Sequence, residues 1–493
     1  KRALELLGVP HEVVSNEFVI VKGEDASCLA RCIKIDDHNK LKSIVGNNTK
    51  TLEVVNLLAP FTIRDKCGTF IGARMGRPEK AKMRKLAGSP HILFPVGEQG
   101  DRLRSFQSAL KAGKVDSDFS TFFCKNCALE TIYPTCEVCK QPSVRLYNCP
   151  DCGADENEQC RHGKKKSYKR SPLDISTYFH RAVEQLGLRT YPDLVKGVKG
   201  TSNKDHMVEH LAKGILRAKH NVCVNKDGTT RYDMTELPIT HFRPKDIKTP
   251  VQRLRELGYT LDIFGKELEH PTQIVEIKPQ DIILPLNENS LDESSKKVIY
   301  RVSKFVDELL ERFYRQEPYY NLEKEDDLVG HLVIGLAPHI SAGLIGRIIG
   351  FSDTQGCFAH PLWHAGLRRD CDGDECCVML LMDALLNFSR QYLPDQRGAK
   401  TMDSPLVLTS VLIPSEVDDQ SHGLDNQWWY PLQLYEAAAR YQNPGDIKIE
   451  QIKHRLETEW QYEHFGFTHP VSNMNYGVKC SAYKTIPTMG EKV

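Results

Sequence analysis

The chain has 493 residues, of which 40% are hydrophobic and 27% charged, a composition typical of water-soluble globular proteins with roughly two to four domains. Its net charge of +1 excludes a uniformly basic or acidic protein, so binding of a polyanion must depend on local charge. No apolar run approaches the roughly 18–20 residues that a membrane span needs, and no signal peptide is recognised. We therefore expect a cytoplasmic protein without membrane contacts and, because the chain begins at Lys1, a piece of a longer one.

Residues 1–60 are expected to form a mixed α/β lead-in region, with a short helix and strand-like runs such as residues 17–21. Residues 61–118 follow as a basic, glycine-rich region. Glycines recur there every four residues, which favours a strand-and-turn path whose backbone approaches a ligand closely. Phosphate is the ligand that arginine forks and lysine point charges would bind, and a solvated charged face is the alternative. The cations between residues 64 and 85 are Arg64, Lys66, Arg74, Arg77, Lys80, Lys82, Arg84 and Lys85.

Residues 119–170 carry two clusters of metal-ligating side chains. The first has two CxxC pairs, and their four thiolates predict a closed, tetrahedral structural zinc site. The second has one CxxC pair followed by a C-x-H pair, which predicts a Cys3His site. The alternative is that its two leading cysteines bind zinc with other ligands and the histidine is merely exposed. The first ligand set is Cys124, Cys127, Cys136 and Cys139, and the second is Cys149, Cys152, Cys160 and His162.

The remaining chain divides into three regions. Residues 171–327 are predicted as an α/β connecting region, with a helix over residues 296–313 and a strand over residues 280–285. Residues 328–415 contain short apolar runs with glycine at the corners, which predicts a small closed barrel. Residues 416–493 are expected to form a C-terminal α/β region.

An acidic cluster lies inside the predicted barrel, at Asp370, Asp372 and Asp374, with Gly373 and Glu375 completing it. Acids at alternate positions project together, and converging carboxylates favour a hard cation such as Mg²⁺. A solvated acidic turn is the alternative. A calcium loop of the EF-hand type is excluded, because its sixth position needs glycine and its twelfth needs glutamate. Here the sixth is glutamate and the twelfth is leucine.

The apolar run after the cluster, residues 376–386, is expected to form a buried helix. Its N-terminus would then lie beside Asp374 and Glu375, where negative charge is favoured. His360 and His364 are four residues apart and could bind metal, but no third ligand is in register, so we expect a structural role for both.

Several long motifs closely resemble the large subunit of the archaeal family D DNA polymerase, and the similarity covers nearly the whole chain. The motifs are Gly72–Lys82, Gly346–Ser352, Ala359–Pro361, Arg368–Glu375, Leu385–Arg390, Asp403–Leu406 and Ala482–Ile486. The resemblance implies a mixed α/β fold with two double-psi β-barrels, inserted zinc-binding modules and peripheral helices. The first barrel would span residues 61–118 and the second residues 328–415.

The resemblance also implies the activity of a DNA-directed DNA polymerase in archaeal DNA replication, which transfers nucleotides from dNTPs to a primer 3′-hydroxyl with two catalytic Mg²⁺ ions. Asp372 and Asp374 would be metal-binding catalytic residues, with Asp370 as a third. The family often has asparagine where Asp370 stands, so this carboxylate could bind metal or merely be tolerated. The cations that would contact nucleotide or primer are Lys80, Lys82, Lys85, Arg74 and Arg77.

The family tends to have a second CxxC pair where this chain has Cys160 and His162, which leaves the ligand set of the second zinc site open. The implied partners are primer–template DNA, dNTPs, a small proofreading exonuclease subunit and, through regions outside this chain, a sliding clamp. Two alternatives remain at this point. One is a two-barrel polymerase that uses ribonucleotides, and the other is a zinc-bearing nucleic-acid-binding subunit with an inactive site.

Overall fold

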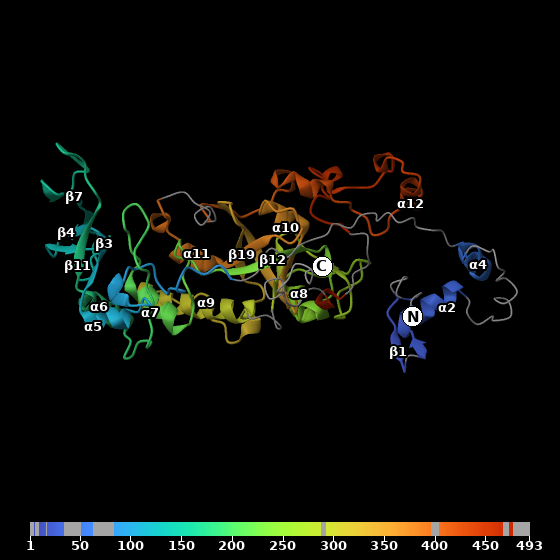
Figure 1. Ribbon diagram of the computed structural model, residues 1–493, viewed down its shortest axis with the longest axis horizontal. Coiled ribbons are helices and arrows are strands. Elements are labelled where there is room, and N and C mark those ends of the chain that lie inside the picture. Colours follow the sequence, from blue (N-terminus) through green and yellow to red (C-terminus); the bar gives the residue numbers. More distant parts are fainter. Residues whose placement is uncertain are drawn as a thin grey trace. The chain divides into compact units, whose positions relative to one another are not determined.

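The computed structural model describes residues 4, 9–15, 17–33, 51–62, 83–286, 292–395, 404–466 and 473–476. The chain divides into two compact units, Lys1–Ala73 with Pro431–Lys448 and Arg74–Tyr430 with Ile449–Val493 (Figure 1). In the first unit, strands β1 (Glu12–Val14) and β2 (Phe18–Ile20) pair antiparallel, which confirms a strand within residues 17–21. Its other elements are α2 (Gly23–Ile33), α4 (Thr51–Leu58), α12 (Leu432–Ala439) and the short helix η9 (Pro444–Asp446).

The second unit is mixed α/β, as predicted, and holds all the candidate sites described below. Its α-helices are α5 (Phe106–Ala112), α6 (Ile175–Leu186), α7 (Leu211–Lys219), α8 (Val251–Glu256), α9 (Ser295–Leu309), α10 (Pro361–Gly366) and α11 (Leu381–Asn387). A π-helical turn, η3 (Leu310–Tyr314), extends α9, so the predicted helix over residues 296–313 is confirmed. Its 3-10 helices are η1 (Glu98–Gly100), η2 (Pro244–Ile247), η4 (Glu325–Leu328), η5 (Arg390–Tyr392), η7 (Pro414–Glu416), η8 (Asp419–Gly423), η10 (Ile452–His454) and η11 (Met474–Tyr476).

Seven strands of the second unit form the largest sheet. Their order is β15-β18-β12-β19-β16-β17-β20, and β15 also pairs with β17. The first six strands therefore pair in a ring, with parallel pairings at β12–β18 and β15–β17 and antiparallel pairings elsewhere. The strands are β12 (Tyr232–Pro238), β15 (Asp281–Pro285), β16 (Leu332–Leu336), β17 (Ala342–Ser352), β18 (Gly356–Ala359), β19 (Glu375–Leu380) and β20 (Val407–Thr409).

The ring includes strands from two regions that we separate by sequence. β12 and β15 lie in the predicted connecting region, and β15 confirms the strand expected over residues 280–285. The pairings do not by themselves confirm two double-psi barrels. Most of the basic segment of the predicted first barrel, residues 63–82, lies outside the described residues.

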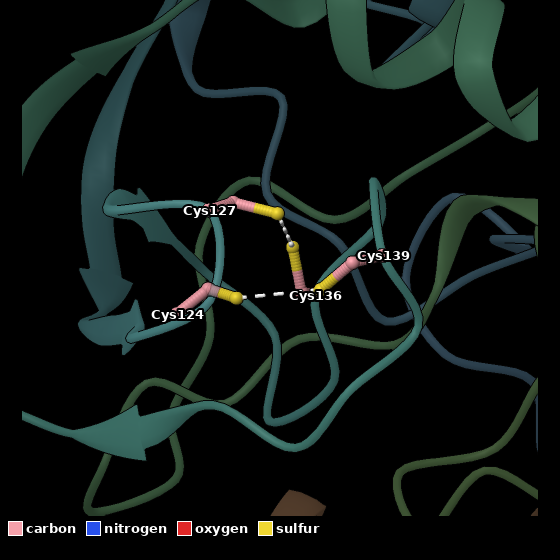
Figure 2. A group of neighbouring side chains, drawn as sticks. All are labelled: Cys124, Cys127, Cys136 and Cys139. Atoms are coloured by element: carbon pink, nitrogen blue, oxygen red, sulfur yellow. Dashed lines mark hydrogen bonds between the residues drawn. The ribbon is translucent and has the colours of Figure 1, made fainter.

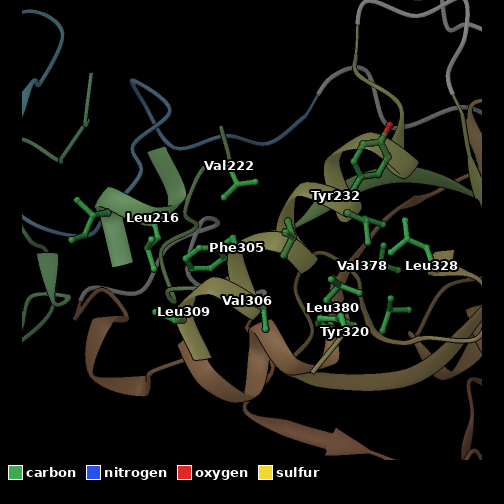
Figure 3. Close-up of a cluster of buried hydrophobic side chains, with 14 of the residues drawn as sticks. Leu216, Val222, Tyr232, Phe305, Val306, Leu309, Tyr320, Leu328, Val378 and Leu380 are labelled. Carbon is green, nitrogen blue, oxygen red and sulfur yellow. The ribbon is translucent and has the colours of Figure 1, made fainter. Parts of the chain in front are cut away.

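Helix α9 packs against the sheet through one apolar stripe. Its buried residues recur at helical spacing, so one face meets β12, β15 and β19 while the other is polar. Figure 3 shows Phe305 and Val306 of this helix in a cluster with Tyr232 of β12 and Val378 of β19. These contacts fix β12 and β19, the two strands that carry the acidic site at one end.

The apolar run that we expected as a helix, residues 376–386, is divided between a strand and a helix. β19 covers Glu375–Leu380 with every residue buried, and α11 begins only at Leu381. A strand between β12 and β16 is covered on both faces, so it loses the alternating pattern and resembles a buried helix in sequence. The prediction of Asp374 and Glu375 at a helix N-terminus is therefore wrong, because Glu375 begins the strand.

Helix α10 is held against the ring by close packing of Trp363. A Cβ atom at Gly335 of β16 would lie 2.3 Å from Cζ2 of this side chain, so glycine is required there. Trp363 is fully buried, and the contact fixes the helix that also carries His364. Among the described residues, no helix combines the length and the apolar character that crossing a bilayer requires.

Four small sheets complete the second unit between residues 115 and 173, and one further pair lies near residue 241. β3 (Val115–Ser120) pairs with β11 (Tyr168–Leu173), and the three strands β4 (Phe122–Cys124), β5 (Leu129–Thr131) and β6 (Val144–Arg145) form a ribbon. β7 (Tyr147–Cys149) pairs with β8 (Gly153–Asp155), β9 (Gln159–Cys160) with β10 (Gly163–Lys164), and β13 (His241–Phe242) with β14 (Val275–Glu276). These short ribbons carry the cysteine clusters.

Asp383 is a fully buried acid in the first turn of α11. It accepts hydrogen bonds from the N–H of Thr230 (2.7 Å) and from the side-chain amide of Asn387 (2.8 Å). Burial nevertheless raises the pKa of Asp383 to about 6. Because this folded-state pKa lies above the ordinary value of 3.8, the proton is bound more tightly by the folded chain. The protonated form of Asp383 therefore stabilises the folded chain at low pH, and this contribution is lost as the pH rises through about 6.

We expect the free energy of unfolding of Asp383→Asn to rise relative to that of the natural protein as the pH increases from 4.5 to 7.5. The gain is about 3 kcal/mol at most. The amide keeps an acceptor for Thr230, and rotation of Asn387 would present its Oδ1, which has no hydrogen-bond partner, to the new NH2. Thermal midpoints of both proteins at the two pH values measure the difference. Asp193→Asn, at an exposed position, is the control, and a stability difference independent of pH would contradict the assignment.

Candidate active site and metal centres

The acidic loop connects α10 to β19, and its backbone turns the carboxylates toward one another. Cys371 and Gly373, which alternate with the three aspartates, have φ values of 63° and 100°. Positive φ at alternate residues coils the chain into a tight turn, for which glycine is well suited and cysteine pays a small strain cost. The structure thus brings together Asp370, Asp372 and Asp374, as the spacing predicts.

A fourth carboxylate joins them from a different part of the chain. One ligand atom from each of Glu236, Asp370, Asp372 and Asp374 can be chosen so that all lie within 4.8 Å of one another. Glu236 lies on β12, where its backbone N–H donates to the carbonyl of Asp374 at 2.9 Å. The neighbouring residue pair, Thr235 with Glu375, is in register between β12 and β19. Strand pairing therefore fixes Glu236 against the loop.

Glu236 is not among the site residues predicted from the sequence. It follows no motif, and its distance from the loop along the chain gives no spacing to recognise. The only signal is a charged residue inside a strand that is otherwise suited to burial, and Asp233 on the same strand shares that property.

Arg369 contributes positive charge at the edge of the cluster. Nη1 of Arg369 lies 3.7 Å from Oδ2 of Asp374, and its Nη2 donates to the carbonyl of Pro338. Oδ1 of Asp370 and of Asp372 are closed off from solvent. Carboxylates this close and this poorly hydrated repel one another strongly unless a cation lies among them. The donor set of hard oxygen atoms fits Mg²⁺.

The end of the basic segment is attached next to the acidic loop. Nε of Arg84 donates to Oε2 of Glu375 at 2.8 Å, and the backbone N–H of Arg84 donates to Oδ2 of Asp233 at 2.7 Å. Arg84 and Lys85 line a polar cavity of about 300 Å³ together with Asp233. Lys85 is exposed. Of the other cations predicted to contact phosphate, Arg74, Arg77, Lys80 and Lys82 lie outside the described residues.

The two histidines of this region differ in their contacts. Burial lowers the pKa of His360 to about 3, and its Nδ1 accepts the N–H of Leu362 (3.1 Å), so it is a neutral N-cap of α10. The structural role expected for His360 is confirmed. His364 is also buried, but its Nδ1 lies 3.1 Å from Oε2 of Glu236. Its Nε2 donates to the carbonyl of Leu237 at 3.1 Å, which ties the ring to β12.

The first cysteine cluster lies at the ends of the β4–β5–β6 ribbon. Figure 2 shows the four thiol groups turned toward a common point. Sγ of Cys124 is 3.4 Å from that of Cys139, and Sγ of Cys136 is 4.0 Å from that of Cys127. A tetrahedral site with Zn–S bonds of about 2.3 Å separates its sulfurs by about 3.8 Å. The geometry fits zinc.

The second cluster is built from the β7–β8 and β9–β10 ribbons. Nδ1 of His162 lies 3.6 Å from Sγ of Cys149 and 3.2 Å from Sγ of Cys152, and Cys160 completes the group. The same nitrogen is 3.7 Å from Oδ2 of Asp151. The structure thus brings the Cys3His set together, and this group could also bind zinc.

We expect the purified protein to carry about two zinc ions, and Cys136→Ser to carry about one. Removing one of four ligands opens the first site and leaves three thiolates that bind the ion more weakly. Elemental analysis after gel filtration measures the stoichiometry. Cys223→Ser is the matched control, because Cys223 is partly buried and lies in neither cluster. Equal zinc content in the Cys136 variant and in the control would contradict the prediction.

The chain matches two models of a known protein family. Residues 187–492 match the family described as "DNA polymerase II large subunit DP2, catalytic domain", and residues 1–158 match its central domain. The carboxylate cluster lies within the catalytic-domain match, and the two matches place the chain in the class of polymerase large subunits. The chain belongs to the DNA polymerase II large subunit DP2 family, which confirms the resemblance seen in its motifs.

Relatives with the same description are found in several archaea. The chain is 44% identical to the DNA polymerase II large subunit of Archaeoglobus fulgidus, 44% to that of Nanoarchaeum equitans and 43% to that of Pyrococcus furiosus. All of this chain is covered in each comparison, but only 43%, 43% and 39% of the respective relatives. The chain thus spans less than half the length of these relatives.

Proposed function

We propose that this chain carries the polymerase active site of a DNA-directed DNA polymerase that extends a primer 3′-hydroxyl with dNTPs in archaeal DNA replication. The observation that supports this most directly is the convergence of Asp370, Asp372 and Asp374 with Glu236 inside the segment that matches the catalytic domain. A cluster of this kind has the charge and oxygen ligands that two-metal nucleotidyl transfer requires.

Asp372 and Asp374, with Asp370, are proposed to hold two Mg²⁺ ions, which when bound would lower the pKa of the 3′-hydroxyl and neutralise the triphosphate. In the reaction the 3′-oxygen bonds to the α-phosphorus while the bond to pyrophosphate breaks. The residues contribute by position. The backbone hydrogen bond from Glu236 to Asp374 holds β12 and the acidic loop together, and Arg84 holds Glu375 beside them.

The phosphate contacts are proposed to come from Lys80, Lys82, Lys85, Arg74 and Arg77. Their support is the attachment of Arg84, at the end of this segment, to Glu375 beside the acidic loop. Positive charge near the transferred phosphates would stabilise charge that develops in the transition state. We also propose that the six-stranded ring is one of the double-psi barrels, which its mixture of parallel and antiparallel pairings supports.

Both cysteine clusters are proposed as structural zinc sites, because each offers four protein ligands and leaves no position for substrate. The remaining proposed partners are primer–template DNA, a small proofreading exonuclease subunit and a sliding clamp. These belong to the whole polymerase, of which this chain is less than half by the length of its relatives.

Primer extension by the complete polymerase, with dNTPs or NTPs and with or without Mg²⁺, tests the proposal. We expect Mg²⁺-dependent extension that prefers dNTPs. Preference for NTPs would favour the two-barrel polymerase that uses ribonucleotides. DNA binding without extension on any substrate would favour the nucleic-acid-binding subunit with an inactive site.

A further inference from the structure

Glu236 is unlike the other acids that are buried in the described parts of the chain. Both of its carboxylate oxygens are closed off from solvent and accept no hydrogen bond. Each of the others accepts at least one hydrogen bond from a side chain or a backbone N–H. They are Glu209, Asp227, Asp233, Asp246, Asp281, Asp307, Glu375 and Asp383.

The nearest polar group does not satisfy this carboxylate. Nδ1 of His364 lies 3.1 Å from Oε2 of Glu236, but Nε2 of the same ring donates to the carbonyl of Leu237, which can only accept. The contact between Nδ1 and the carboxylate lacks the geometry of a hydrogen bond, so both oxygens of Glu236 stay unsatisfied. A buried carboxylate without a hydrogen bond thus lies beside three aspartates, an arrangement that a cation would relieve.

The position of Glu236 is fixed by the fold rather than by a flexible loop. Its backbone N–H donates to the carbonyl of Asp374, and the residue is in register with Cys357 of β18. Both neighbouring strands therefore hold β12 in place, and the side chain is oriented toward the loop before any ligand binds. Rigid placement of a ligand reduces the reorganisation that metal binding requires.

We propose that Glu236 is a direct ligand of the catalytic divalent cation, shared with the aspartates of the acidic loop. This rests on the proposed function and extends it. The metal would be held from two segments of the chain, so part of its binding energy would stabilise the pairing of β12 with the loop. Metal binding should then persist without DNA or nucleotide.

Binding of Mn²⁺ alone to the complete large subunit, followed by electron paramagnetic resonance, tests this. We expect Glu236→Gln to weaken the tightest exchangeable Mn²⁺ site at least tenfold, because the amide supplies no negative charge. Glu236→Asp, which keeps the charge but withdraws the oxygens, should weaken it less. Without metal, Glu236→Gln should raise the thermal midpoint, and added Mn²⁺ should raise it less than in the natural protein. Glu276→Gln, on β14 and outside the cluster, is the control.

Asp372→Asn separates failure of this inference from failure of the proposed function. If Asp372→Asn weakens Mn²⁺ binding while Glu236→Gln stays within twofold of the natural protein, Glu236 is no ligand and the polymerase site stands. If only Glu236→Gln weakens binding, the cation is not shared with the loop and the inference is wrong. If Asp372→Asn alters neither Mn²⁺ binding nor primer extension, the proposed function fails.

Discussion

Replacement of Asp374 or Asp372 by asparagine is expected to lower the rate of primer extension roughly a thousand-fold or more, which corresponds to about 4 kcal/mol in the activation free energy. Asparagine has nearly the same shape but no negative charge, so the loop should keep its turn while its affinity for the cation falls. The measurement is single-turnover extension of a labelled primer over a range of Mg²⁺ concentrations, in the complete polymerase.

Two further variants make this result specific. Asp193→Asn changes an exposed acid outside the site and should extend primers normally. Asp370→Asn should lose less than tenfold, because the resemblance seen in the motifs implies that asparagine is tolerated at this position. Near-normal extension by the Asp372 or Asp374 variant, with unchanged dependence on Mg²⁺, would show that the acidic loop is not the catalytic site.

Arg217→Met is expected to destabilise the second unit by about 3–5 kcal/mol, since it leaves a buried carboxylate without its partner. Arg217 and Glu209 are both fully buried on or beside α7, and the guanidinium donates to both oxygens of Glu209 at 3.0 and 2.9 Å. The same group donates to the carbonyls of His91 and Gly228 and lies over the ring of Phe305. It thereby joins segments that are far apart along the chain.

The double variant Glu209→Gln with Arg217→Met tests the cause. Glutamine keeps an acceptor for the N–H of Leu93, which now donates to Glu209 at 2.9 Å, and removes the unpaired charge. We expect the thermal midpoint to fall by about 4–6 °C in the single variant and to recover by at least half in the double variant. Equal midpoints for the single and double variants would mean that lost packing, rather than the uncompensated charge, is responsible.

The features that sequence predicts best are those whose geometry is local. Each cysteine pair spans a single turn, so the ligand sets could be chosen from spacing, and the structure brings both sets together. The three aspartates are similar, because alternate positions across a tight turn converge whatever the rest of the fold does. In each case a few dihedral angles decide the result.

The features that sequence misses depend on pairing between distant segments. Residues 376–380, the first half of the run that we expected as a helix, are all apolar, and only their place between β12 and β16 makes them a strand. Glu236 reaches the acidic loop through the same pairing, since its register is set by β18 and β19. A single sequence does not show which strands become neighbours, so neither strand β19 nor the position of Glu236 could be predicted from the residues alone.

Strand β12 has a consequence for how the chain is made. It ends at Pro238, whereas its two neighbours begin at Gly356 and Glu375, which emerge from the ribosome 118 and 137 residues later. Until then both of its edges are open, and such nascent strands are prone to mispairing and slow to fold. A truncated product that stops before residue 370 would contain Glu236 but none of its aspartate neighbours. Unfinished chains would therefore lack the carboxylate cluster, however much of the preceding polypeptide had folded.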